Sequence, residues 1–258
     1  MPVHPTAVLD PGAEVDEAAE IGPYCVLGPG VVVGARTRLI AHVVIDGDTR
    51  LGCDNVVFPF TTIGVAPQDL KYQGEPSRTR IGDRNRIRES VTIHRGTAGG
   101  GMETTLGDDN LLMAYTHIAH DVQIGNHCIL SHAATIGGHV QIGDWAVVGA
   151  ATGIHQFCRI GRHAMIGGYS VITQDVLPFA TTVSERKNRV FGANRVGLER
   201  RGFTAAQIEP LQTALRLLTR AGLNTTQALE RIQEELPQTP ELAELIAFIR
   251  SSERGFIK

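Results

Sequence analysis

LLMAYTHIAHDVQIGNHCILSHAATIGGHVQIGDWAVVGAATGIHQFC, residues 111–158, carries an aliphatic residue at every sixth position. A small residue often follows four positions later, as at Cys128, Ala134 and Ala146. A period of six fits neither the 3.6-residue period of an α-helix nor the two-residue period of a single strand. It is typical of a solenoid in which a short strand and a turn repeat. The repeat positions in this stretch are Leu112, Ile118, Ile124, Leu130, Ile136, Ile142, Val148 and Ile154.

The same period begins at Val3 and continues to Ile172. We expect the aliphatic side chain to point inward and the small residue to pack beside it. A glycine often directly follows the aliphatic residue, and we expect it to let the backbone bend. Three hexads would form one triangular coil, so that residues 18 apart stack at the spacing of paired strands, about 4.8 Å. An ordinary β-sandwich is the alternative, but its strands would not keep phase over so many hexads. The sequence therefore predicts an all-β solenoid over residues 1–180.

Two segments interrupt the period, at residues 64–79 and 94–105. In solenoids such insertions map to loops at a coil corner, often on the side that binds ligands. The second segment contains Gly99, Gly100 and Gly101, but no Lys-Ser or Lys-Thr pair follows them. We therefore interpret the glycines as a flexible loop and not as a phosphate-binding loop.

Residues 181–258 are predicted to form a C-terminal α-helical domain, with helical patterning from about Asn194 onward. Thr204 and Gln207 have the spacing of a capping box, and Pro210 is expected to bend the helix that follows or to move its start. Pro240 stands at the first position of a last helix. We expect this region to pack on itself and on a neighbouring subunit. Its apolar stripes consist of Leu211, Leu215 and Leu218, and of Leu242, Leu245, Ile246 and Ile249.

Composition limits the class of protein. The chain has 258 residues, a formal net charge of −3, and no run of 18 apolar residues that would predict a membrane span. No secretory signal is visible at the N-terminus, so we expect a cytoplasmic protein. Cys25, Cys128 and Cys158 occupy the small inward position and Cys53 lies in a turn phase, a pattern that favours packing over disulfides or zinc ligation.

Histidines cluster in the quoted stretch. His120, His139 and His155 follow one another at intervals close to one coil, which places them near one corner on successive coils, about 5 Å apart along the axis. His117 and Asp121 lie beside His120. Three interpretations stay open at this point: a solvated row of turn residues, a zinc site, or a general base with substrate-binding neighbours.

Five motifs together resemble the UDP-N-acetylglucosamine acyltransferases, over nearly the whole chain. They are APQDLKYQGE (66–75), HIAHD (117–121), GGH (137–139), IHQFC (154–158) and FGANRVGLERRGF (191–203). The resemblance implies a left-handed parallel β-helix, a handedness that periodicity alone does not predict. It also implies a homotrimer with active sites between subunits. The implied reaction moves an R-3-hydroxyacyl group from acyl carrier protein to the 3-hydroxyl of UDP-N-acetylglucosamine, the first step of lipid A synthesis, without metal or cofactor.

The resemblance also assigns roles to individual residues. His120 is implied as the general base, Asp121 as the group that orients it, and the Gly138 backbone N–H as the donor to the oxyanion. Asp121 could instead only form a turn hydrogen bond, and Asp69 with Lys71 only a surface charge pair. Gly168 is implied to line the acyl groove, where a missing side chain predicts a long acyl chain. The implied substrate-binding residues are Gln68, Asp69, Lys71, His117, His139, His155, Gln156, Gly168, Asn194, Arg200 and Arg201.

Basic residues gather between Ser184 and Gly202, where six Lys and Arg face two Glu. Arg159 and Arg162 precede this stretch. Such a patch is expected to attract an acidic carrier protein. Because it lacks interleaved aromatic residues, a nucleic-acid partner is not expected. The sequence leaves open the acyl chain length, and whether the acceptor carries a 3-hydroxyl or a 3-amine. The rival functions are a later N-acyltransferase of the same pathway, an acetyl-CoA-dependent transferase, a metal-dependent lyase and a non-catalytic scaffold. The basic residues are Arg186, Lys187, Arg189, Arg195, Arg200 and Arg201.

Overall fold

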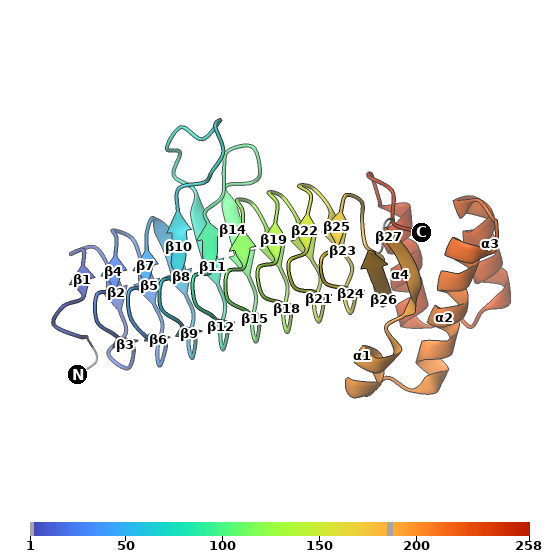
Figure 1. Cartoon of the computed structure of the whole chain (residues 1–258), viewed down its shortest axis with the longest axis horizontal. Helices are drawn as coiled ribbons and strands as arrows, with labels where there is room; N and C mark the ends of the chain where they lie inside the picture. Colours follow the sequence, from blue (N-terminus) through green and yellow to red (C-terminus); the bar gives the residue numbers. More distant parts are fainter. Residues whose placement is uncertain (1–2, 185–187) are drawn as a thin grey trace.

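The protein is a long triangular β-solenoid with a group of helices at one end. The computed structural model describes residues 3–184 and 188–258. Strands of mostly two residues follow one another around the axis, and parallel neighbours stack along it (Figure 1). The chain therefore has three long parallel sheets, which form the three faces of the solenoid.

Each sheet collects every third strand up to β25, and sheet 3 also contains β26 and the antiparallel β27. Sheet 1 consists of β1 (Val8–Leu9), β4 (Val26–Leu27), β7 (Val44–Ile45), β10 (Thr62–Val65), β13 (Thr92–His94), β16 (His117–Ile118), β19 (Thr135–Ile136), β22 (Gly153–Ile154) and β25 (Val171–Ile172). Sheet 2 consists of β2 (Glu14–Val15), β5 (Val32–Val33), β8 (Asp48–Leu51), β11 (Arg78–Ile81), β14 (Glu103–Leu106), β17 (Gln123–Ile124), β20 (Gln141–Ile142) and β23 (Arg159–Ile160). Sheet 3 consists of β3 (Glu20–Ile21), β6 (Arg38–Leu39), β9 (Val56–Val57), β12 (Arg86–Ile87), β15 (Leu111–Leu112), β18 (Ile129–Leu130), β21 (Val147–Val148), β24 (Met165–Ile166), β26 (Ala180–Ser184) and β27 (Asn188–Ala193).

Each coil consists of three hexads, as predicted, except at the two insertions and at the last coil, where Ile166 pairs with Thr182 and the coil is two residues shorter. Ile118 pairs with Ile136, and Ile136 pairs with Ile154, so that each partner lies three hexads further along the chain. Leu51 instead pairs with Ile81, and Ile81 pairs with Leu106, which makes both of these coils longer than three hexads. The extra residues form the loops between β10 and β11 and between β13 and β14, which project from the same corner of the solenoid (Figure 1).

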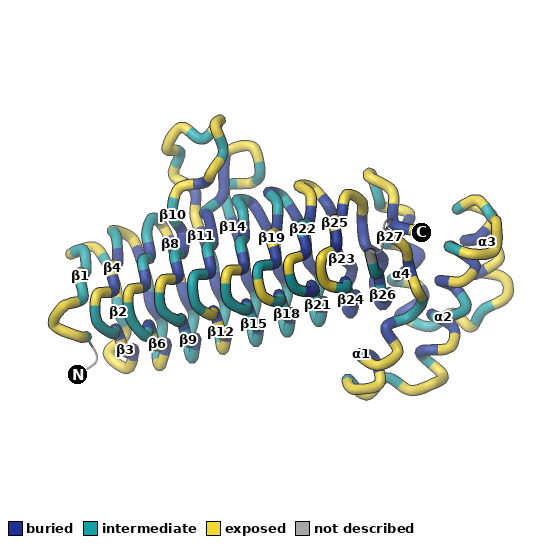
Figure 2. Tube along the Cα trace, in the orientation of Figure 1, coloured by how far each residue is buried: buried dark blue, intermediate teal, exposed yellow. Residues whose placement is uncertain are grey.

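The core is a stack of aliphatic side chains, as the period predicts. Ile63, Ile87, Leu112 and Ile136 are fully buried, and Figure 2 shows the dark buried positions alternating with exposed corners along the solenoid. Each fully buried side chain of this kind contributes about 1.5–3 kcal/mol to folding. The small inward residues, including Cys25, Cys128 and Cys158, are also fully buried and fill the space between these layers.

The glycines after the repeat positions have a different role from the predicted one. Gly22 and Gly143 do not have a positive φ. A Cβ at Gly22 would lie 1.8 Å from the Ile40 carbonyl oxygen, and one at Gly143 would lie 2.6 Å from the Arg162 nitrogen. These glycines therefore let successive coils stack closely. The left-handed turn falls two residues later on non-glycine residues, such as Tyr24 at φ 58°.

A β-hairpin and four helices complete the chain. The hairpin, β26 with β27, extends sheet 3 and is a feature that sequence analysis does not predict. The helices are α1 (Arg195–Arg200), α2 (Ala205–Arg220), α3 (Thr225–Glu235) and α4 (Pro240–Arg250). The predicted capping box at Thr204 is present, and α4 begins at Pro240 as expected. Pro210 lies inside α2 and does not move its start, while α3 is not among the predicted elements.

The C-terminal residues return to the last coils of the solenoid. Asp175 forms a parallel bridge with Phe256, and Ile257 donates its backbone N–H to the Asp175 carbonyl at 3.0 Å. The predicted division at residue 180 coincides with the first residue of β26, and the assignment of two domains stays a prediction. Within residues 3–184 and 188–258, no helix is both long enough and apolar enough to cross a membrane.

His163 predicts a pH-dependent stability. Burial lowers its pKa to about 4 from the ordinary 6.5. Its Nδ1 has no hydrogen-bond partner among the described residues, and its ring packs among those of Trp145, Phe179 and Phe203. Because the unfolded chain binds this proton more tightly, wild-type stability should fall as the pH drops from 6.5 towards 4, by about 3 kcal/mol from this group. His163→Phe should lose this part of the pH dependence of the unfolding free energy, which denaturant titrations at several pH values measure. If the unfolding free energy of both proteins falls equally as the pH drops, His163 is not the group responsible.

Candidate active site

Most of the predicted site residues gather at or near the corner where sheet 1 passes into sheet 2. His120 and Asp121 follow β16, Gly138 and His139 follow β19 one coil later, and Gln156 follows β22. Both projecting loops leave this same corner, after β10 and β13. The binding side that the insertions predict is therefore the corner that carries the histidines.

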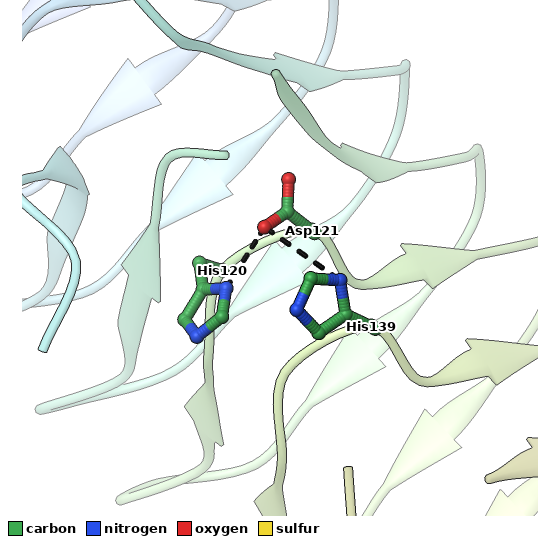
Figure 3. Close-up of side chains that lie close together, drawn as sticks. All are labelled: His120, Asp121 and His139. Atoms are coloured by element: carbon green, nitrogen blue, oxygen red, sulfur yellow. Dashed lines mark hydrogen bonds and ion pairs between the residues drawn. The ribbon is translucent and has the colours of Figure 1, made fainter. Parts of the chain in front are cut away.

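His120 and Asp121 form a close pair. The His120 Nδ1 lies 2.8 Å from the Asp121 Oδ2, and the His120 side chain is 14% exposed while the carboxylate is fully buried (Figure 3). When Nδ1 carries the proton, the ring donates it to the carboxylate. The Nε2 atom is then left with a free lone pair.

Asp121 is itself held in place by the second loop. Its Oδ1 accepts the Thr97 backbone N–H at 2.9 Å, and its Oδ2 accepts the Thr97 hydroxyl at 2.5 Å. The Asp121 backbone N–H is bound by the Thr104 hydroxyl at 2.8 Å. A Cβ at Gly100 would lie 2.1 Å from the Asp121 carboxyl carbon, so only glycine lets the loop cover this carboxylate. The carboxylate therefore connects the second loop to His120, in addition to any contact within its own turn.

His139 occupies on its coil the position that Asp121 occupies on the coil before. Its Nδ1 lies 3.8 Å from the Asp121 Oδ2, and its ring centroid lies 5.0 Å from that of His120 (Figure 3). The ring also stacks on Phe157 of the following coil at 4.3 Å. Burial lowers the pKa of His139, with the Asp121 carboxylate opposing the shift, which favours a neutral ring.

The histidines share the corner but do not form a single column. Along the coils, His120 stacks with Gly138 and Gln156, whereas His139 stacks with Asp121 and Phe157. His155 is one residue earlier in phase and is exposed. Because the intervals between these histidines differ slightly from one full coil, the three residues occupy three different positions around the coil.

Gly138 lies directly against the His120 ring. A Cβ there would be 2.7 Å from Cε1 and 2.8 Å from Nε2 of His120. Among the hydrogen bonds of the described residues, none uses the Gly138 backbone N–H. Gly138 and His120 thus line the same cavity of about 370 Å³. The cavity is lined by Gln68, His94, His117, Ala119, His120, Gly137, Gly138, Ile154, His155 and Gln156.

His94 is a site residue that the sequence analysis does not identify. It is 5% exposed, its Nδ1 bonds the Ala66 carbonyl at 2.7 Å, and its ring lies 5.3 Å from that of His117. Burial lowers the pKa of both rings, and the Thr92 hydroxyl lies 2.7 Å from the His117 Nδ1. His94 directly follows the repeat position Ile93, as His155 follows Ile154, and this phase is the signal that could identify it.

The first loop brings some of its predicted residues to the cavity. Gln68 lines it directly. Asp69 and Lys71 lie close enough for their charges to act on His139. Asp69 also accepts the Lys71 backbone N–H at 3.0 Å through its Oδ1, a local turn contact. No ion pair joins these two side chains among the described residues.

Four predicted residues lie away from this cavity within the same chain. Gly168 lies beside Ala150, at the corner where sheet 3 passes into sheet 1. Asn194 is buried as the cap of α1 and donates its side-chain amide to the His163 carbonyl at 3.0 Å. Arg201 places its guanidinium 5.0 Å from the Trp145 ring centroid, and Arg200 is exposed.

Part of the predicted basic patch is neutralised within the chain. Arg195 pairs with Glu199 and Glu209, Arg159 pairs with Asp175, and Arg162 pairs with Glu244. Glu185, Arg186 and Lys187 lie outside the described residues.

Comparison with known proteins agrees with this geometry. Residues 103–138 match the model of the bacterial transferase hexapeptide (six repeats), and residues 175–257 match the model described as Udp N-acetylglucosamine O-acyltransferase; Domain 2. The acyl-[acyl-carrier-protein]–UDP-N-acetylglucosamine O-acyltransferase of Thermodesulfovibrio yellowstonii is 48% identical over 256 residues, which cover 99% of each chain.

Two solved structures show the same architecture along the whole chain. LpxA from Acinetobacter baumannii superposes with a TM-score of 0.96 at 42% identity, covering 100% of both chains. LpxA from Bacteroides fragilis, a UDP-N-acetylglucosamine acyltransferase, gives a TM-score of 0.97 at 40% identity, covering 99% of this chain and 100% of that one. The predicted left-handed parallel β-helix with a C-terminal helical region is confirmed. The chain therefore belongs to the family of UDP-N-acetylglucosamine O-acyltransferases.

Proposed function

We propose that this enzyme transfers an R-3-hydroxyacyl group from acyl carrier protein to the 3-hydroxyl of UDP-N-acetylglucosamine, with His120 as the general base. The observation that carries the proposal is the His120–Asp121 pair, together with Gly138 against the same imidazole, whose backbone N–H makes no hydrogen bond among the described residues. The 48% identity to an enzyme whose name states this donor and acceptor supports the choice of substrates. The reaction would be the first step of lipid A synthesis, in the cytoplasm.

His120 supplies the base that the acceptor needs. A sugar hydroxyl is a weak nucleophile at neutral pH, and its proton must leave as its oxygen attacks the thioester carbon. Asp121 holds the His120 Nδ1–H, which leaves Nε2 to take that proton, and its negative charge stabilises the imidazolium that forms. The same imidazolium then returns the proton to the departing thiolate of the carrier.

Gly138 supplies the electrostatic part of the mechanism. The thioester oxygen becomes negative in the tetrahedral intermediate, and a pre-positioned backbone N–H lowers the energy of that state. The Gly138 N–H is unbonded among the described residues, and the residue itself lies against the His120 ring. The base and the oxyanion donor can thus act on two atoms of one bond-forming centre, with no metal and no covalent enzyme intermediate.

Polar groups around the cavity provide the acceptor site. Gln68 and His117 line it from the loop and from β16, and His155 and Gln156 line it from the third coil. Burial favours the neutral form of both His94 and His117 through a lowered pKa. The Nδ1 of His94 already bonds the Ala66 carbonyl and that of His117 the Thr92 hydroxyl, so Nε2 of each ring is the nitrogen left for a sugar hydroxyl. Asp69 and Lys71 extend this site from the first loop.

A homotrimer would complete the site. Gly168, Asn194, Arg200 and Arg201 lie away from the His120 cavity of their own chain, so in this proposal they reach the cavity of a neighbouring subunit. Sheet 1 and the corner between sheets 3 and 1 expose an apolar surface of a kind that marks an interface. It includes Val8, Tyr24, Val26, Phe60, Tyr115, Tyr169 and Val171, all at least 40% exposed.

Gly168→Met is expected to shift the preference towards shorter acyl chains. The glycine presents no side chain at a corner that, in the trimer, would face the acyl groove. A methionine would extend into that groove from a Cβ that lies 3.1 Å from the Ala150 carbonyl oxygen. The measurement is kcat/KM over a ladder of R-3-hydroxyacyl carrier proteins, with a preference for long chains in the wild type. If the variant has the same preference for acyl chain length as the wild type, Gly168 does not line the acyl groove.

The function itself is tested by mixing purified protein with UDP-N-acetylglucosamine and the ladder of acyl donors, with and without EDTA, and identifying products by mass. An O-acylated sugar nucleotide formed equally well in EDTA supports the proposal. A product formed only with the 3-amino acceptor would keep the family chemistry and change the substrate. No product with either acceptor would contradict the proposal.

A further inference from the structure

We propose that His120, Asp121 and His139 also form an inhibitory binding site for a zinc ion. One ligand atom from each of the three side chains lies within 4.8 Å of the others (Figure 3). The three come from two successive coils and point towards one another across the corner. This site is additional to the acyl-transfer mechanism, in which no metal takes part.

The atoms and their separations suit zinc. Two imidazole nitrogens and one carboxylate oxygen are common zinc ligands, at about 2.0–2.2 Å from the ion. Ligand atoms around a tetrahedral zinc are about 3.4 Å apart on this geometry. The His120 Nδ1 and the His139 Nδ1 lie 2.8 and 3.8 Å from the Asp121 Oδ2, on either side of that value. Small rotations of the two rings would therefore admit the ion.

The surroundings of the carboxylate support a ligand role. The Thr97 backbone N–H and hydroxyl both bind Asp121 and hold its orientation without using His120. Hydrogen bonds of this kind orient metal-ligating carboxylates. A groove of about 550 Å³, lined by Asp121, His139, Gly100, Gln123 and Gln141 among others, borders the site and gives an entry path and room for a water as fourth ligand.

Zinc binding would disable the base, an effect that rests on the proposed function. In the active state the His120 proton is on Nδ1, facing Asp121, and Nε2 is free to accept. Zinc on Nδ1 takes the place of that proton, and the neutral ring then carries its proton on Nε2. A ring in this state cannot accept the proton of the sugar hydroxyl, so acyl transfer should stop while the fold stays intact.

Direct binding is measured first, on the full-length enzyme with any tag removed, by titrating zinc against a chromophoric chelator. Wild type should bind one zinc per chain at this site. His120→Gln and His139→Gln should each weaken it at least about tenfold, because loss of a ligand exceeds the effect of losing its outer partners. His132→Gln, at another corner, is the matched control and should bind as the wild type does. Equal affinity in all four proteins would overturn the proposal, and thermal melts identify any variant that fails to fold.

Inhibition is measured second, in the acyl-transfer assay. Zinc should inhibit the wild type with a midpoint equal to its binding constant, EDTA should restore the rate, and Mg²⁺ at the same concentration should have no effect because it prefers oxygen ligands. Zinc bound at this site with an unchanged rate would overturn the inhibitory role. An enzyme inactive with every acceptor in EDTA would contradict the proposed function and leave the binding result standing.

Discussion

His120→Ala is expected to lower kcat by about 10²- to 10⁴-fold, the range that a positioned general base contributes. The reason is the geometry of the pair: the Asp121 Oδ2 fixes the His120 Nδ1 at 2.8 Å, so Nε2 is the atom left to accept a proton. Alanine removes that acceptor and leaves the rest of the cavity in place. The measurement is steady-state acyl transfer at saturating acceptor, which separates kcat from changes in KM.

The control for this variant is His4→Ala, because His4 is exposed near the start of the solenoid, does not line the His120 cavity, and places its Nδ1 2.9 Å from the Thr6 hydroxyl. It should keep nearly the wild-type rate. Asp121 keeps its two bonds from Thr97 when His120 is absent, so the fold should survive. A His120→Ala enzyme with a rate within a few-fold of wild type would rule out general-base catalysis by this residue.

Gly138→Ala should lower kcat by about 10²-fold or more, an effect comparable with the loss of an oxyanion donor. The added methyl carbon would lie 2.7 Å from Cε1 and 2.8 Å from Nε2 of His120, closer than real side-chain contacts allow. The ring must then rotate away from Asp121, or the backbone carrying the N–H must move. Both changes separate the base from the oxyanion donor.

This variant should remain folded, since Gly138 does not have the positive φ that would strain an alanine. Gly153→Ala is a matched control in the neighbouring strand β22, where an added Cβ meets nothing within 4 Å. Both proteins should melt at similar temperatures, and only Gly138→Ala should lose activity. If the two retain the same kcat, close contact between position 138 and the imidazole does not matter for the reaction.

Much of the fold could be predicted because the six-residue period is a local signal. Repeat positions such as Ile118 and Ile136 specify both the inward face and the pairing register, so the sheets follow from counting residues. The β26–β27 hairpin could not be predicted in this way, because its strands pair through tertiary contacts beyond the last complete coil. The predicted role of Gly22 was wrong for a related reason. A glycine that packs closely against the next coil and a glycine at which the backbone bends look the same in a sequence.

The candidate site could be predicted where its residues lie on the same coil or at matching positions of two successive coils. His120 and Asp121 are neighbours in sequence, and Gly138 lies one coil further on, so their contact follows from the period. His94 was missed because the coil after it contains the second loop, which changes the spacing to the other histidines. Gly168 and Arg201 came from the resemblance alone, since no spacing within one chain brings them to the cavity.

The corner that carries the site also limits how the chain can change in length. His139 faces Asp121 only because three hexads complete one circuit of the solenoid. Removing a single hexad between them would turn every later residue by a third of a circuit, and His139 would move to another corner. Removing a whole circuit far from the site would instead shorten the protein and preserve the catalytic pairing. The loops after β10 and β13 add residues to their circuits, yet the strands that follow them return in register. Extra residues therefore do not disturb the strand pairing where they form a loop that projects from a corner.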